Sequence, residues 1–102
     1  GGYKFPNGTI QTTAVRIKSG RSDFGKCKRK QTLTKTIDLG NTFSAAPHVI
    51  VSLSHIDSDH RSNLRINSWA SEVSKGSFKI NVQSWADTTI YASTVSWIAI
   101  GH

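Results

Sequence analysis

The sequence predicts an all-β sandwich or small barrel, formed by a single domain that spans residues 1–102. Thr, Ser, Val and Ile dominate, and no long stretch places apolar residues at helical spacing. Short runs of strand-forming residues recur along the chain instead, and turn-forming residues separate them. The length of 102 residues suits one domain with one core.

Six runs have the residue types of β-strands. The first three place apolar side chains at alternate positions, although Lys35 interrupts the pattern in the second run. The segments DSDHRSN, at 57–63, and SKGS, at 74–77, have the composition of turns. The expected strands are residues 12–18, 32–39, 48–56, 64–70, 78–85 and 90–101.

The alternation of side chains indicates which functional candidates lie outside the core. Phe78, Ile80 and Val82 share one face of their strand. Trp85 lies an odd number of residues from each of them and falls on the opposite face unless a bulge intervenes. In the run LRINSWA, Arg65 points outward by the same argument.

The final run carries apolar side chains on both faces. Tyr91 and Trp97 share one phase, whereas Ile98 and Ile100 belong to the other. This pattern predicts a central strand whose outer side is covered, for which another subunit is one candidate. We expect Trp97 in the core or at a contact between subunits, and Trp69 at an interface.

The formal net charge of +7 is concentrated in the first third of the chain. Residues 1–35 contain nine Lys and Arg and one acid, Asp23, whereas the remainder contains four bases and five acids. This asymmetry has two interpretations. It indicates a surface for nucleic acid, sulfated glycan or another anionic partner, or a solvated face that keeps the protein soluble.

Asn7 and Cys27 bear on the cellular compartment. Asn7-Gly8-Thr9 is a glycosylation sequon, which matters only in a secretory compartment, although Asn-Gly is also an ordinary turn. Cys27 is the single cysteine and has Gly and basic neighbours, so we expect an exposed thiol, free or bridging two subunits, rather than a buried small residue. No run of about 18 apolar residues occurs, so no membrane span is expected. We expect a secreted, extracellular protein.

Neither a metal site nor an active site is predicted. The segment HIDSDH, at 55–60, offers two His and two Asp, but it lies where a turn is expected, and Asp-Ser-Asp is common in turns. The chain has no G-x-S-x-G, no H-E-x-x-H and no phosphate-binding glycine loop. We therefore expect a binding protein without a cofactor rather than an enzyme.

Five segments in this order resemble the H-type lectin domain, the module of snail agglutinins and of the C-terminal half of discoidin lectins: PHVIVSLSHID, NLRI, KGSFKI, SWADTTIY and VSWIAIG. The resemblance implies a six-stranded antiparallel β-sandwich that assembles as a homotrimer, sometimes paired into a homohexamer. It also implies metal-free binding of terminal galactose or N-acetylgalactosamine in a shallow site between neighbouring subunits.

The resemblance assigns sugar binding, by position, to Arg65, Trp85 and Tyr91. Two positions depart from the family pattern. Ala86 stands where some members have a histidine that contacts the ligand. An ungapped count puts Lys28 where a sugar-binding aspartate is found. The internal disulfide of the snail members is also missing.

These side chains suit a sugar chemically. Aromatic rings cover the C–H face of a pyranose, and a guanidinium with several fixed donors bridges the axial hydroxyl of galactose and its neighbour. Asp87 and Thr88 are interpreted as turn formers that set the angle between the two aromatics.

The sequence therefore predicts a galactose- or N-acetylgalactosamine-binding lectin, made multivalent by oligomerisation, that serves as an agglutinin or in self/non-self or microbial recognition. The alternative is a basic β-sandwich module that binds polyanions, either sulfated glycans or nucleic acid. If the protein is a galactose- or N-acetylgalactosamine-binding lectin, we do not expect nucleic acid as a partner.

Overall fold

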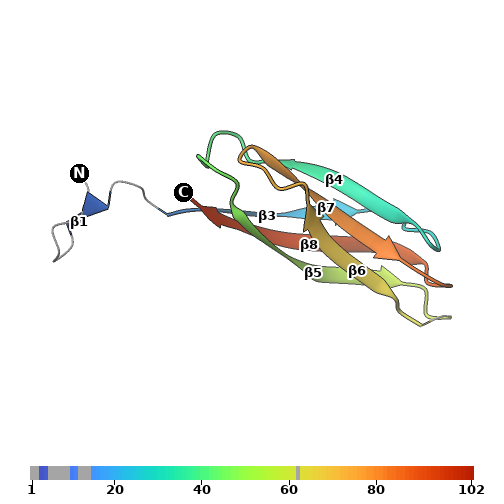
Figure 1. The fold of residues 1–102 in the computed structure, drawn as a ribbon. Helices are drawn as coiled ribbons and strands as arrows, with labels where there is room; N and C mark the ends of the chain where they lie inside the picture. Colours follow the sequence, from blue (N-terminus) through green and yellow to red (C-terminus); the bar gives the residue numbers. More distant parts are fainter. Residues whose placement is uncertain (1–2, 5–9, 12–14, 62) are drawn as a thin grey trace.

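The computed structural model of the chain describes residues 3–4, 10–11, 15–61 and 63–102. All regular structure in these residues is β-strand, arranged as one two-stranded and two three-stranded antiparallel sheets (Figure 1). The strands are β1 (Tyr3–Lys4), β2 (Ile10–Gln11), β3 (Arg16–Phe24), β4 (Thr32–Asp38), β5 (His48–Ser58), β6 (Ile66–Ser71), β7 (Ser77–Ser84) and β8 (Ile90–Gly101). The prediction of an all-β sandwich is confirmed.

The strands β3 to β8 correspond in order to the six that the sequence predicts. The first differs most, because β3 continues to Phe24 instead of ending near residue 18. As an edge strand paired only with β8, β3 does not need apolar side chains at alternate positions along its whole length. Gly20 does not interrupt it: a Cβ there would lie 2.9 Å from the Trp97 ring, so the glycine makes room for the core.

The central strands of the two sheets are β8 and β7. The strand orders are β3-β8-β5 and β4-β7-β6, so the prediction of a central strand at 90–101 is confirmed. Figure 1 shows the two sheets stacked face to face, with the β3–β4, β5–β6 and β7–β8 connections at one end. We call this end, formed by residues 25–31, 59–61, 63–65 and 85–89, the turn end.

The core lies between these two central strands. Buried side chains alternate along both strands and meet across the sandwich: Phe78, Ile80 and Val82 of β7, and Val95, Trp97 and Ala99 of β8. The rings of Phe78 and Trp97 pack edge to face, with centroids 5.2 Å apart and an interplanar angle of 72°. Trp97 thus occupies the core, which is one of the two locations that the sequence allows.

The outer face of the β3-β8-β5 sheet carries isoleucines near the C-terminal end of β8. The sheet register places Ile17 beside Ile100 and Ile50 beside Ile98. Ile17 is 63% exposed and Ile50 is 49% exposed. We call these four side chains the apolar face. Covering by another subunit, as expected from the two-sided pattern of β8, stays a prediction.

Candidate functional site

Backbone hydrogen bonds join the connections at the turn end. Cys27 and Ile90 exchange two of them, with N–O distances of 2.7 and 2.9 Å. The N–H of Asp59 donates to the carbonyl of Thr89 at 3.0 Å. Segments that are far apart in the sequence are therefore held side by side at one end of the sandwich.

Trp85 begins a β-turn that leads from β7 into β8. The N–H of Thr88 donates to the carbonyl of Trp85 at 3.3 Å, and Ala86, the second residue of the turn, has a φ of 57°. Residues other than glycine adopt positive φ at a cost, so Ala86 stores strain in this turn. The Trp85 side chain is 45% exposed, and it lies outside the core as its phase predicts.

Thr88 ties this turn to the segment that carries Arg65. Its hydroxyl donates to the carbonyl of Asn63 at 2.5 Å and accepts the N–H of Arg65 at 3.0 Å. The Thr88 side chain is buried, so both hydrogen bonds are shielded from water and are stronger for it. Thr88 therefore does more than form a turn, because it fixes the backbone of Arg65 next to Trp85.

Asp87 holds the guanidinium of Arg65. Nη1 of Arg65 lies 2.6 Å from Oδ1 of Asp87, and both side chains are partly exposed. A guanidinium has several N–H donors in a fixed fork, so one carboxylate contact leaves donors available to a ligand. Asp87, read from the sequence only as a turn former, also places a carboxylate acceptor at the site.

A β-bulge directs Tyr91 away from the core. Asp57 and Ser58, which are consecutive in β5, pair with Ala92 and Ile90 of β8, so Tyr91 has no partner across β5. The phase of β8 changes here, because Ile90 is buried although it shares parity with the outward-facing residues of the strand. The Tyr91 side chain is 43% exposed. Alternation along the sequence could not reveal this bulge.

A second arginine, Arg61, lies beside Tyr91 and was missed by sequence reasoning. It forms a bidentate pair with Asp59, with Nε–Oδ1 and Nη2–Oδ2 distances of 2.9 and 2.7 Å. The hydrogen bond with Asp59, and to a smaller degree the nearby Tyr91 side chain, raises the pKa of Arg61. The hydrogen bond from Arg61 holds the pKa of Asp59 below its usual range. The only signal in the sequence was an acid and a base two residues apart in a presumed turn.

Lys28 lies on the β3–β4 connection, next to the end of β7. Its carbonyl accepts the hydroxyl of Ser84 at 2.6 Å, and the N–H of Ser84 donates to the carbonyl of Gln31 at 3.1 Å. Because Ser84 directly precedes Trp85, the backbone of Lys28 is close to the Trp85 turn. The Lys28 side chain is exposed.

The exposed setting expected for Cys27 is wrong. The side chain is fully buried, with Sγ 3.2 Å from the carbonyl oxygen of Gln31 and 3.6 Å from Oγ of Ser84. The basic neighbours of Cys27 in the sequence predict a solvent-exposed thiol, but the pairing of Cys27 with Ile90 turns the thiol inward. A disulfide between subunits stays a prediction, and it would require this connection to open.

Three further expectations concern other parts of the chain. Asn7 lies outside the described residues, so its glycosylation stays a prediction. The turn expected at 57–63 begins later, because Asp57 and Ser58 still belong to β5. Within the described part of the chain, no three His, Cys, Asp or Glu side chains gather as metal ligands.

No helix in the part of the chain that the structure describes is long and apolar enough to cross a membrane.

Comparison with known protein families gives a match to the H-type lectin domain over residues 34–100, which is most of the chain. The chain belongs to the H-type lectin domain family. It is accordingly a carbohydrate-binding lectin domain rather than an enzyme, and the family resemblance of the sequence is confirmed.

A solved structure and a curated protein are similar to this lectin domain. The native structure of recombinant discoidin II from Dictyostelium discoideum matches 85% of this chain and 37% of its own, with a TM-score of 0.76 and 13% identity. The two share the fold. A protein of Fuscovulum blasticum described as ATP synthase subunits region ORF 7 is 37% identical over 59 residues, which is 58% of this chain. The match covers 51% of that relative's length.

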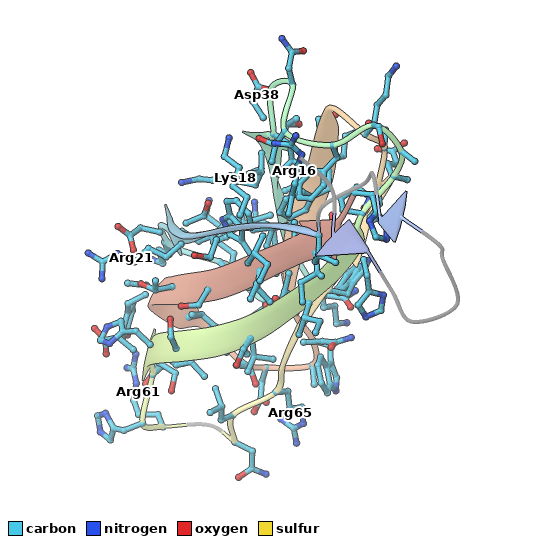
Figure 2. The ribbon with its side chains drawn as sticks, turned by 90° about the vertical axis from the view of Figure 1, so that its left-hand side faces the viewer. Arg16, Lys18, Arg21, Asp38, Arg61 and Arg65 are labelled. Carbon is cyan, nitrogen blue, oxygen red and sulfur yellow. The ribbon has the colours of Figure 1, made fainter. Side chains whose placement is uncertain are left out.

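In this lectin domain, the residues assigned to the sugar site lie at the turn end, except Tyr91, which is the second residue of β8. Arg65, Trp85 and Ala86 are linked through the turn that Thr88 closes. Tyr91 follows the same turn but lies beside Arg61. Figure 2 shows Arg61 and Arg65 on one side of the sandwich, both from the β5–β6 connection. This end of the sandwich therefore offers an indole, a phenol, two guanidinium groups and a carboxylate, all accessible to solvent.

Proposed function

We propose that this lectin domain binds terminal galactose or N-acetylgalactosamine at the turn end, with Arg65, Trp85 and Tyr91 as its main contacts. One observation carries the proposal: Thr88 joins the turn that begins at Trp85, whose indole is exposed, to Arg65, whose guanidinium a carboxylate holds in place. The indole covers the C–H face of the sugar, and the guanidinium donates to the axial hydroxyl and its neighbour.

The departures from the family pattern shape this proposed site. A lysine at position 28 cannot accept a hydrogen bond from a sugar hydroxyl, whereas a carboxylate can. Asp87, whose side chain is 58% exposed beside Arg65, supplies an acceptor in the same region. Ala86 presents only a methyl group, so it offers an apolar contact in place of an imidazole.

Assembly provides the avidity that one shallow site lacks. The apolar face supports a homotrimer or a homohexamer, because covering its isoleucines would remove exposed apolar area from water. Identical sites at fixed spacing raise avidity by about 10²–10⁴ when they engage together. Such a protein agglutinates cells or recognises microbial surfaces.

A secretory route is part of the proposal. The sequon at Asn7 supports it, since that motif is modified only in a secretory compartment. Expression in a glycosylating cell should give secreted protein whose mass falls on treatment with an N-glycosidase. An Asn7→Gln protein should lack that change in mass, and an unmodified wild type would remove this support.

Chromatography on immobilised N-acetylgalactosamine in about 0.5 M salt, where exposed ionic contacts are screened, tests the ligand. The wild type should be retained and should elute with free galactose. Arg65→Ala should pass through, and Arg65→Lys should bind at least about tenfold more weakly, because an ammonium lacks the planar fork. Lys75→Ala removes the same charge from the β6–β7 turn and should behave as wild type.

Circular dichroism should give the same β-sheet spectrum for all four proteins, which separates loss of binding from loss of fold. Retention of the Arg65→Ala protein would contradict the proposed site. Passage of the wild type straight through the column would contradict the proposed ligand.

A further inference from the structure

Nearly all of the excess positive charge lies along one side of the sandwich. Residues 16–38, which comprise β3, β4 and their connection, hold eight basic and two acidic residues. Residues 39–102 hold four of each. Both β3 and β4 are edge strands. We call the cations at this side the basic edge: Arg16, Lys18, Lys26, Lys28, Arg29, Lys30 and Lys35.

Two of these lysines close the gap between the sheets. In the sheet registers, Lys18 and Lys35 belong to the phases that face the core. Their stems run along the edge instead, and the ammonium of Lys18 donates to the carbonyl of Leu39 at 3.3 Å. The ammonium of Lys35 donates to the carbonyl of Asp23 and lies 5.1 Å from the centroid of the Phe24 ring. These two cations therefore have a structural role, because they cover the open edge between the sheets.

The other five cations have no such explanation. Their side chains are exposed and form no ion pair with another described residue. Three of them, Lys28, Arg29 and Lys30, are consecutive in a turn that the N–H of Gln31 closes on the carbonyl of Lys28 at 3.2 Å. Mutual repulsion at this turn disfavours the free state, and a bound anion would relieve it.

The acids of the same segment do not neutralise this charge. Oδ1 of Asp23 accepts the hydroxyl of Thr94 at 2.8 Å, on the outer face of the sheet. Oδ1 of Asp38 accepts the N–H of Gly40 at 2.8 Å, at the end of β4 away from the turn end. Among the described residues, neither carboxylate forms an ion pair with the basic edge.

We infer that the basic edge binds a linear sulfated polysaccharide, along a surface that begins beside the site proposed for neutral sugar and runs away from it. By the rise of an extended strand, Arg16 lies roughly 30 Å from the connection, with Lys18 beside it on β3 and Lys35 of β4 reaching the other end of β3 at Asp23. A linear chain with repeated sulfates presents anions along a comparable line. Each ionic contact releases condensed counterions, so affinity arises from many exposed contacts in a row.

The basic edge runs from the turn end to Arg16, away from the neutral-sugar site. Figure 2 shows Arg16 and Lys18 on the side of β3 that faces Asp38, with Arg61 and Arg65 on the opposite side of the sandwich. The connection that holds Lys28 is where the row reaches the turn end. A polysaccharide on the basic edge therefore leaves most of the proposed galactose site accessible.

Nucleic acid fits this edge less well. Proteins that bind single strands combine cations with aromatic side chains on which bases stack. The exposed large aromatics among the described residues are Trp85 and Tyr91, and both belong to the turn-end site. Duplex grooves are read by a helix or a protruding ribbon, and β3 and β4 are instead packed into the sandwich.

The test measures binding of size-defined heparin fragments in the presence of excess free galactose. The edge variant is Lys26→Gln/Lys30→Asn, in which asparagine suits the φ of 58° at position 30. The matched control is Lys75→Gln/Lys79→Gln, which removes the same net charge from the β6–β7 region. Loss of two ionic contacts should weaken binding about 15- to 30-fold at 0.15 M salt and flatten the slope of log K against log salt by roughly 1.4–1.8.

The control variant should stay within about twofold of wild type, since it only lowers the net charge. Equal losses in the two variants would overturn the inference. So would the absence of heparin binding, or tighter binding of a single-stranded oligonucleotide of equal charge. The edge variant should still be retained on immobilised N-acetylgalactosamine, so failure of the galactose proposal and failure of this one give different results.

Discussion

The outer faces of the two sheets differ in how far contacts within the single chain hydrogen-bond or bury their side chains. On the β4-β7-β6 sheet, Asn81 donates to the carbonyl of Trp69 at 3.3 Å and to the hydroxyl of Ser71 at 2.9 Å. It also accepts the hydroxyl of Thr34 at 2.8 Å. On the β3-β8-β5 sheet, the central strand presents Ile98 and Ile100 between apolar neighbours. Around Asn81 the first face is polar and hydrogen-bonded within the chain, with the half-buried Trp69 beside it, whereas the second face exposes apolar area near the C-terminal end of β8.

This difference distinguishes residues that stabilise the folded single chain from residues that favour assembly. A face whose polar groups bond one another lowers the free energy of the folded single chain. An exposed cluster of isoleucines does not, because its apolar area stays in water until something covers it. We therefore expect substitutions on the β4-β7-β6 face to change the free energy of unfolding, and substitutions on the apolar face to change association.

The largest expected effect comes from placing a charge on the apolar face. Ile50→Lys should abolish assembly, because burying an unpaired ammonium costs more than the isoleucine contact contributes. Avidity for a surface dense in galactose should fall by about 10²–10⁴, while affinity for the free monosaccharide stays within about twofold. Sedimentation velocity and binding to a coated surface measure both quantities.

Thr36→Lys is the control, because it adds the same charge to an exposed position of β4 on the polar sheet. It should change neither assembly nor avidity. An Ile50→Lys protein that sediments like the wild type would show that this face is not the contact between subunits.

A smaller effect is expected where β3 crosses the largest side chain of the core. Gly20→Ala would place a Cβ 2.9 Å from Cζ2 of Trp97, a ring that packs against Phe78 and has little room to move. We expect a loss of about 2 kcal/mol in the free energy of unfolding, as for other overpacked cores. Urea denaturation at fixed protein concentration measures it.

Gly25→Ala, at the residue that follows β3, provides the comparison. A Cβ at Gly25 meets nothing within 4 Å. This substitution should be neutral or should stabilise the protein by less than about 1 kcal/mol, because alanine restricts the unfolded chain. Equal destabilisation by both substitutions would mean that contact with Trp97 is not the cause.

The sequence could predict those features that depend on the regular alternation of buried and exposed side chains along a strand. Alternation located the strands and placed Trp85 outside the core, because side chains of a strand point to opposite faces in turn. Tyr91 also lies outside, but for a reason that alternation cannot supply, since a bulge changes the phase of β8 next to it.

The wrong prediction for Cys27 and the omission of Arg61 from the site have one cause, which is contact between segments distant in the sequence. The sequence neighbours of Cys27 are basic or glycine, yet its backbone pairs with Ile90 and its thiol is buried. Arg61 and Asp59 joined the site only because the β5–β6 connection lies against Thr89. Such contacts depend on the stacking of the two sheets, and local composition does not encode them.

The smallest expected effect is on the polar face and completes the comparison. Asn81→Ala removes hydrogen bonds to three neighbours, which can turn partly to water, so we expect a loss of about 1 kcal/mol in the free energy of unfolding. Gln83→Ala, on the same face of β7, should change this free energy by less than about 0.5 kcal/mol. Sedimentation of Asn81→Ala should match the wild type. A change in its association state would instead mean that both faces contribute to assembly, and that the division between a folding face and an assembly face is wrong.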